Sequence, residues 1–161
     1  MAVKQAEQAK PDLLIVDDDP LITDTLNFVL SRDFNVYVAE SRDQMKSLLR
    51  QLESPPKLAL VDLGLPPTPH RPDEGFHLIS ELIAHSPGMK IVVLSGQSDK
   101  ANARHARTLG AIEFVAKPAE PETLKALLNR SLEVREAELG AQADSGLLGK
   151  SMLVEKLRQQ I

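Results

Sequence analysis

Short apolar runs alternate along the sequence with segments of helical spacing. Each run is rich in Val, Ile and Leu, a composition typical of parallel strands that are covered on both faces. The five runs are Leu13–Val16, Val36–Ala39, Leu58–Val61, Ile91–Leu94 and Ile112–Val115. This alternation predicts βα units joined by right-handed crossovers, and therefore an α/β fold.

Five segments with helical spacing follow these runs, at residues 20–30, 41–52, 76–84, 99–109 and 121–139. The first opens with Pro20 at a first-turn position, and its predicted apolar side consists of Leu21, Thr25, Phe28 and Val29. The second opens with Ser41, which we predict to cap it. For this number of elements we expect a flavodoxin-like (βα)5 doubly wound parallel sheet with strand order 2-1-3-4-5.

Composition narrows the classes of protein. The 161 residues fit one domain with an appendage, and 42% hydrophobic residues suffice for a core. A net charge of −4 disfavours nucleic-acid binding by this chain alone. The absence of cysteine excludes disulfides, a thiol nucleophile and a cysteine-based zinc site. Residues 1–11 form a polar tail without a signal-peptide core, and no run is long enough for a membrane span, so we expect a cytoplasmic protein with no membrane partner.

Polar residues follow the predicted strands at the sheet edge where ligands bind in this architecture. In chain order they are Asp17, Asp18 and Asp19, then Asp62, Ser95 and Lys117. Carboxylates gathered at a partly buried site are costly unless they are neutralised, and Mg²⁺ is a suitable hard cation. A carboxylate can also attack phosphorus, with a metal and a lysine stabilising the charge on the transferring oxygens. One aspartate after a strand is more often a helix cap, but the whole set at successive strand ends indicates a functional site.

These pieces resemble the receiver domain of two-component response regulators. The matching segments are LLIVDDD at 13–19, VDLGLP at 61–66, VLSG at 93–96 and FVAKP at 114–118. The resemblance covers residues 12–137 and includes the Gly110-Ala111 pair before the fifth strand. It implies a signalling domain that a sensor histidine kinase phosphorylates, not an enzyme, with at most slow self-phosphorylation and self-dephosphorylation.

The resemblance also implies a role for each residue of the acidic cluster. Asp62 is then the phosphoacceptor, and Asp18 is a direct Mg²⁺ ligand. Asp17 binds the metal through water, and the backbone carbonyl of Gly64 completes the protein ligands. Asp19 falls outside the metal site and caps the following helix.

Three further residues take roles by the same resemblance. Ser95 is the switch hydroxyl, Lys117 contacts the phosphate, and Phe114 is the aromatic residue that repacks on activation. Two features depart from the usual pattern. Phe114 has no hydroxyl where tyrosine is common, and Pro67–Glu74 lengthens the loop beside the site. That loop, with Asp73–Phe76, resembles the receivers of PEP-CTERM-associated regulators in particular.

The C-terminal tail predicts a larger protein. We assign residues 12–139 to the receiver, 140–147 to a linker and 148–161 to the start of a truncated ATPase-type output domain. LGKS at 148–151 resembles the opening of the ATPase domain in sigma-54-dependent, nitrogen-regulation-type transcription regulators. A phosphate-loop interpretation fails because Asp144 stands where that motif needs glycine. DNA binding would belong to an output domain that this chain lacks.

Two homodimer surfaces stay open: the last helix, through Leu124, Leu128, Leu132 and Leu139, and the face made by the fourth helix, fifth strand and fifth helix. Packing within the domain explains the leucines equally well. Two other functions also stay open. A constitutive interaction module would not need the complete acidic set. A phosphatase-like hydrolase would need a second acid where Gly64 stands. The histidines, at 70, 77, 85 and 105, share no metal-binding spacing.

Overall fold

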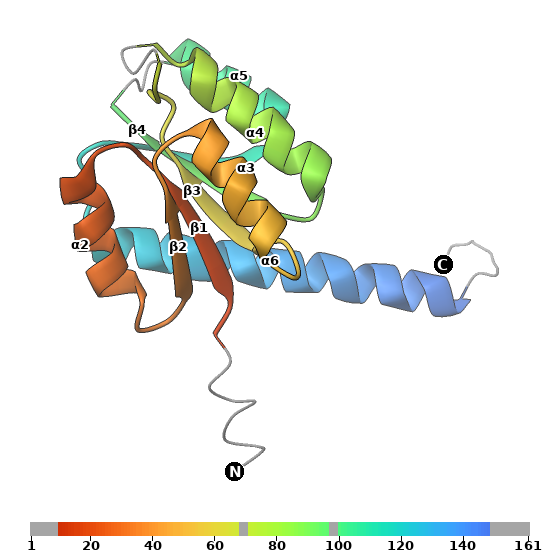
Figure 1. The fold of residues 1–161 in the computed structure, drawn as a ribbon. Coiled ribbons are helices and arrows are strands. Elements are labelled where there is room, and N and C mark those ends of the chain that lie inside the picture. The colour runs from red at the N-terminus through yellow and green to blue at the C-terminus, as the bar shows by residue number, and fades with distance from the viewer. Residues whose placement is uncertain (1–9, 68–70, 97–99, 149–161) are drawn as a thin grey trace.

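The computed structural model describes residues 10–67, 71–96 and 100–148, with side chains up to residue 139. Five parallel strands form one sheet in the order β2-β1-β3-β4-β5, which confirms the predicted topology. Figure 1 shows helices lying on both sides of this sheet. The strands are β1 (Asp12–Val16), β2 (Asn35–Ala39), β3 (Leu58–Val61), β4 (Lys90–Ser95) and β5 (Ala111–Ala116).

Five helices cover the two faces of the sheet. They are α2 (Pro20–Leu30), α3 (Arg42–Gln51), α4 (Asp73–His85), α5 (Lys100–Leu109) and α6 (Pro121–Leu148). Helices α2 and α6 pack on one face and α3, α4 and α5 on the other, so the core has two halves. In β1, Leu13 and Ile15 belong to the first half, whereas Leu14 and Val16 belong to the second. Both sides of the strand are therefore apolar, as in other parallel sheets that are covered twice.

The strand register brings the carboxyl ends of the strands to one edge. Val16 pairs with Ala39 on β2 and with Val61 on β3. The Asp62 amide donates to the Val16 carbonyl at 2.8 Å, which continues the ladder by one residue beyond β3. From β1 the chain adds β2 on one side and then β3, β4 and β5 on the other, so the order of strands switches between β1 and β3. Ligands bind at such a switch point. The residues that follow β1 and β3 lie beside it.

Helix α2 corrects one prediction. Its core-facing residues are Thr23, Leu26 and Leu30, whereas Leu21 is 75% and Phe28 is 78% exposed. The helix carries two apolar stripes, and helical spacing alone does not reveal which stripe the sheet covers. The prediction that Leu21 and Phe28 lie on the packed side was therefore wrong, and α2 presents large apolar side chains to solvent.

Local sequence signals set the starts of two other helices. Ser41 accepts from the Gln44 amide at 3.2 Å, which confirms it as the cap of α3. Helix α4 begins at Asp73, three residues before the predicted start at 76. Asp73 and Glu74 occupy its first turn, where acidic side chains interact favourably with the helix dipole. The lengthened loop therefore ends in a turn of helix.

Helix α6 corrects the second prediction. Its backbone stays helical to Leu148, through the segment 140–147 that the sequence predicts as a linker. Each glycine lowers helix stability by about 1 kcal/mol relative to alanine. The helix can nevertheless continue through this segment, because adding residues to a helix already formed and packed upstream avoids the cost of nucleation. Figure 1 shows the last part of α6 projecting beyond the sheet. The domain boundary stays a prediction, and the predicted output-domain start at 149–161 lies outside the described residues.

Candidate functional site

Three carboxylates meet at the carboxyl edge of the sheet. One ligand oxygen from each of Asp17, Asp18 and Asp62 lies within 4.8 Å of the other two. Asp17 and Asp62 are buried, with 3% and 7% of their surface exposed, whereas Asp18 is half-buried. The first two residues follow β1 and the third follows β3, so the register of those neighbouring strands brings them together.

Lys117, which follows β5, partly neutralises this acidic cluster. Its Nζ lies 2.9 Å from Asp17 Oδ2 and 3.3 Å from Asp62 Oδ2. The Lys117 amide donates to the Ser95 carbonyl at 3.0 Å, which ties the end of β5 to the end of β4. One ammonium therefore bridges two of the three carboxylates, and the cluster keeps an excess of negative charge.

Backbone amides orient the carboxylates. The Asp19 amide donates to Asp17 Oδ1 at 3.0 Å, and the Gly64 amide donates to Asp62 Oδ1 at 3.3 Å. The side chain of Asp19 does not join the carboxylates: it caps α2 by accepting from the Leu21 amide at 3.0 Å. The structure thus separates Asp19 from the cluster, as the sequence predicts.

Burial and charge shift the pKa values at the site. Burial, followed by the neighbouring charge of Asp17, raises the pKa of Asp62 above its ordinary value, although Lys117 opposes this shift. Burial alone would lower the pKa of Lys117, but its hydrogen bond to Asp17 and the charges of both aspartates raise it. The site therefore makes ionisation of Asp62 harder than it is in water, and it holds the proton of Lys117 more tightly.

The donor set fits a hard divalent cation. Carboxylate oxygens, a backbone carbonyl and water are the ligands that Mg²⁺ prefers. A cation at the cluster would relieve the repulsion that raises the Asp62 pKa. Among the described residues, the acidic triple is the only group of three or more potential ligands that close together.

The backbone after Asp62 is fixed by a contact that sequence analysis missed. The Gly75 amide donates to the Leu63 carbonyl at 3.0 Å, and a Cβ on Gly75 would lie 2.3 Å from Leu63 Cα. Leu63 and Leu65 are fully buried on either side of Gly64. The lengthened loop therefore leaves and rejoins the domain at fixed points. The sequence did offer one signal for this contact: Gly75 stands in the first turn of a helix, and glycine there allows another backbone to approach closely.

The two predicted switch residues lie on neighbouring strands. Ser95 ends β4 and is fully buried. Phe114, on β5, is half-buried and packs against the core half that α3, α4 and α5 cover. The strands pair Val93 with Phe114 and Ser95 with Ala116. Ser95 thus lies at the edge of the sheet that carries the acidic cluster, and Phe114 lies on the adjacent strand against the face that α3, α4 and α5 cover. The switching role of both residues stays a prediction.

None of the three histidines that the structure describes joins the acidic cluster. His77 and His85 are on α4, and the ring of His105 on α5 packs edge-on against Phe76 at 4.4 Å. His70 lies outside the described residues. The described helices also include none with the length and hydropathy of a membrane span.

Comparisons with known proteins agree with this geometry. The family model described as the response regulator receiver domain matches residues 13–129. The alginate biosynthesis transcriptional regulatory protein AlgB of Pseudomonas putida is 27% identical over 150 residues, which cover 92% of this chain and 32% of that protein. The acid tolerance regulatory protein ActR of Rhizobium meliloti is 32% identical over 126 residues, covering 76% of this chain and 61% of that protein.

Solved structures show the same likeness. A CheY-like response regulator receiver domain protein from Methanospirillum hungatei is 27% identical, with a TM-score of 0.72, and the match covers 81% of this chain and 99% of that one. This chain spans less than two thirds of the length of the curated relatives AlgB and ActR. The family match, the sheet order and the acidic cluster lead to one conclusion: this chain belongs to the response regulator receiver domain family.

Proposed function

We propose that Asp62 accepts a phosphoryl group from the phosphohistidine of a sensor histidine kinase in a Mg²⁺-dependent reaction. The observation that carries this proposal is the convergence of Asp17, Asp18 and Asp62, two of which contact the ammonium of Lys117. Asp18, Asp62 and the Gly64 carbonyl would hold the metal directly, with Asp17 acting through water. The bound cation would supply charge stabilisation for the phosphoryl oxygens.

The chain's own residues account for the transfer. A carboxylate oxygen of Asp62 forms the new bond to phosphorus, while the bond between phosphorus and the donor imidazole nitrogen breaks and the imidazole departs. Lys117 is placed to balance charge on the phosphoryl oxygens, because its Nζ already lies 3.3 Å from Asp62 Oδ2. Ser95 then donates to the acyl phosphate, and Phe114 repacks with it. The new dianionic group shifts a two-state equilibrium at the face of α5, β5 and α6.

The direct test is intact mass after incubation with acetyl phosphate, with and without Mg²⁺. Wild type is expected to gain one phosphoryl group from acetyl phosphate when Mg²⁺ is present and none when it is absent. Asp62→Asn is expected to gain none in either condition. Asp19→Asn is the matched control, because Asp19 caps α2 outside the cluster. An adduct of equal yield on Asp62→Asn would contradict the proposal.

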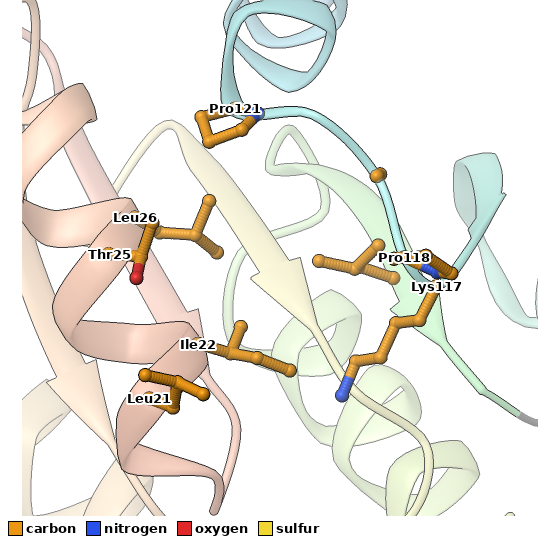
Figure 2. Close-up of a pocket in the computed structure, with 9 residues that line it drawn as sticks. Leu21, Ile22, Thr25, Leu26, Lys117, Pro118 and Pro121 are labelled. Carbon is orange, nitrogen blue, oxygen red and sulfur yellow. The ribbon is translucent and has the colours of Figure 1, made fainter.

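The surface of α2 is the proposed docking site for the kinase. A cavity of about 220 Å³ separates α2 from the loop after β5. In Figure 2, Ile22 and Leu26 lie on one side of it, and Lys117 and Pro118 on the other. Leu21, which also lines the cavity, is exposed, and Phe28 is a second exposed apolar side chain on the same helix. Because Lys117 also contacts Asp62, a partner seated here would reach the phosphoacceptor.

Replacing Phe28 with glutamate is therefore expected to slow transfer from a phosphorylated kinase about tenfold or more, since apolar anchors dominate binding energy. Uptake from acetyl phosphate should stay unchanged, because Phe28 is 78% exposed and is not part of the acidic cluster. Val134→Glu, which changes an exposed apolar residue on α6, is the control. The measurement is the rate at which one phosphorylated kinase, carrying a labelled phosphoryl group, transfers it to wild type, Phe28→Glu and Val134→Glu. Equal rates for wild type and Phe28→Glu would contradict docking on α2.

The wider role is proposed from relatives and from the tail. AlgB and ActR are named as regulatory proteins, which supports a receiver that controls a transcription-regulating output domain. The sigma-54-dependent assignment rests on LGKS at 148–151. Cytoplasmic location, the homodimer through α6 or through the α5, β5 and α6 face, and DNA contact through an output domain stay predictions. So does the PEP-CTERM-associated likeness, which rests on residues 67–76 alone.

A further inference from the structure

Helix α6 continues past its last contact with the apolar core. Leu124 and Leu128 are fully buried in the core, and Leu132 is partly buried against it. After this point Val134 and Leu139 are 38% and 43% exposed. Apolar packing therefore does not explain why the helix keeps its course along the domain beyond Leu132.

Polar contacts replace the apolar ones. The Arg135 side chain donates from Nε to the Gly88 carbonyl at 3.1 Å. Lys90 Nζ lies 2.7 Å from Glu138 Oε1. Lys57 Nζ lies 3.4 Å from Glu136 Oε2. We call these three contacts the latch.

The three contacts differ in their exposure to solvent. The side chain of Arg135 is 19% exposed, and in the second contact the side chain of Lys90 is 16% exposed whereas that of Glu138 is 57% exposed. Partly buried ion pairs are screened less by salt than exposed pairs. Lys57–Glu136 is more exposed and should contribute less. The Arg135 contact is therefore the best shielded part of the latch, and the Lys90–Glu138 pair, shielded on its lysine side, comes second.

The latch joins α6 to the two strands that lead to the site. Lys57 directly precedes β3, whose far end leads to Asp62. Lys90 begins β4, whose last residue is Ser95. The Lys90 amide also donates to the Lys57 carbonyl at 3.0 Å, so the two strand starts are held together. The latch thus lies at the sheet edge opposite the acidic cluster, where β3 and the otherwise buried β4 begin.

We propose that the latch fixes the direction in which the helical extension of α6 leaves the domain. Residues 133–148 then act as a rigid spacer that sets the position of whatever follows them. The latch is a property of the fold, and its use in signalling rests on the proposed function. Releasing it would let the extension swing while the sheet and the acidic cluster stay intact.

The test measures the distance between spin labels on the domain and on the extension. Because the chain has no cysteine, labels can be placed at exposed Asp24 on α2 and at position 143 in the extension. Double electron–electron resonance on the otherwise wild-type chain should give one narrow distance. Glu138→Lys should broaden it, and the swap of Lys90→Glu with Glu138→Lys should restore it.

Glu133→Lys is the matched control, because Glu133 lies on the same helix and is exposed, and the described residues offer it no ion pair. It should leave the distance narrow. A broad distance in wild type, or a narrow one in Glu138→Lys, would overturn the latch. Phosphate uptake by the same variants, measured by mass, should match wild type. Loss of uptake in all of them, wild type included, would instead count against the proposed function.

Discussion

Replacing Lys117 with methionine is expected to destabilise the metal-free protein by about 2–4 kcal/mol, because it leaves Asp17 and Asp62 buried without their counter-charge. The same change should slow phosphate uptake strongly, since it removes the ammonium that lies 3.3 Å from Asp62 Oδ2 and would balance charge on the phosphoryl oxygens. Urea unfolding in a chelator gives the first quantity, and intact mass against time gives the second. Adding Asp62→Asn should recover much of the lost stability, because it removes one of the two unpaired charges.

The pH dependence of this loss follows from the pKa shift of Asp62. Burial and Asp17 raise that pKa, so the ionised carboxylate costs stability at neutral pH. The cost begins to fall as the pH drops through the raised folded-state pKa, and it is gone below the ordinary pKa of the unfolded chain. The destabilisation by Lys117→Met should therefore be full at neutral pH and shrink on acidification. It should not grow, because protonated Asp62 no longer needs the lysine.

Lys125→Met is the matched control. Lys125 pairs with Asp33 at 3.2 Å, but that carboxylate is 44% exposed, so solvent screens the pair and its loss should change the free energy of unfolding far less than the loss of Lys117. Equal losses of stability for Lys117→Met and Lys125→Met would show that the cluster is not held by its lysine.

Replacing Gly75 with alanine should produce the other large effect. The new Cβ would lie 2.3 Å from Leu63 Cα and 2.7 Å from its carbonyl oxygen, and both are backbone atoms that cannot rotate away. Overpacking of this kind costs about 1–3 kcal/mol or more. Because Leu63 stands between Asp62 and Gly64, the shift should also misplace the metal ligands and lower the rate of phosphate uptake.

Gly88→Ala separates this effect from the general cost of changing a glycine. A Cβ on Gly88 would meet only the Arg135 side chain, at 3.9 Å, so its change in unfolding free energy should stay within about 0.5 kcal/mol. Chemical denaturation of both variants, with uptake measured on the folded fraction, gives the comparison. A Gly75→Ala protein with wild-type stability and uptake would contradict the account of the loop.

Strand order and the acidic edge could be predicted because they depend on local signals. Continuous apolar runs such as Leu58–Val61 identify buried parallel strands, and Asp17 and Asp62 follow two of them directly. Parallel topology then places those carboxylates at one edge. The capping roles of Asp19 and Ser41 were predictable for the same reason, since caps act within three residues.

The features that could not be predicted depend on contacts distant in sequence. Helix α2 has apolar residues on two sides, and the sheet, which the local pattern does not include, decides that Leu26 is covered and Phe28 is not. The close approach of Gly75 to Leu63 depends on how a long loop closes. The helical backbone across 140–147 reflects a helix already anchored upstream, which outweighs its glycines.

The most direct measurement of the central claim is to locate the phosphoryl group. Phosphoramidate, whose phosphorus–nitrogen bond resembles that of phosphohistidine, would phosphorylate the chain in Mg²⁺. Borohydride then reduces an aspartyl phosphate to homoserine, which peptide mass spectrometry can place. The account predicts homoserine at position 62 and at no other aspartate of the cluster. Homoserine at Asp17 or Asp18, or a phosphoryl group that resists reduction, would contradict it.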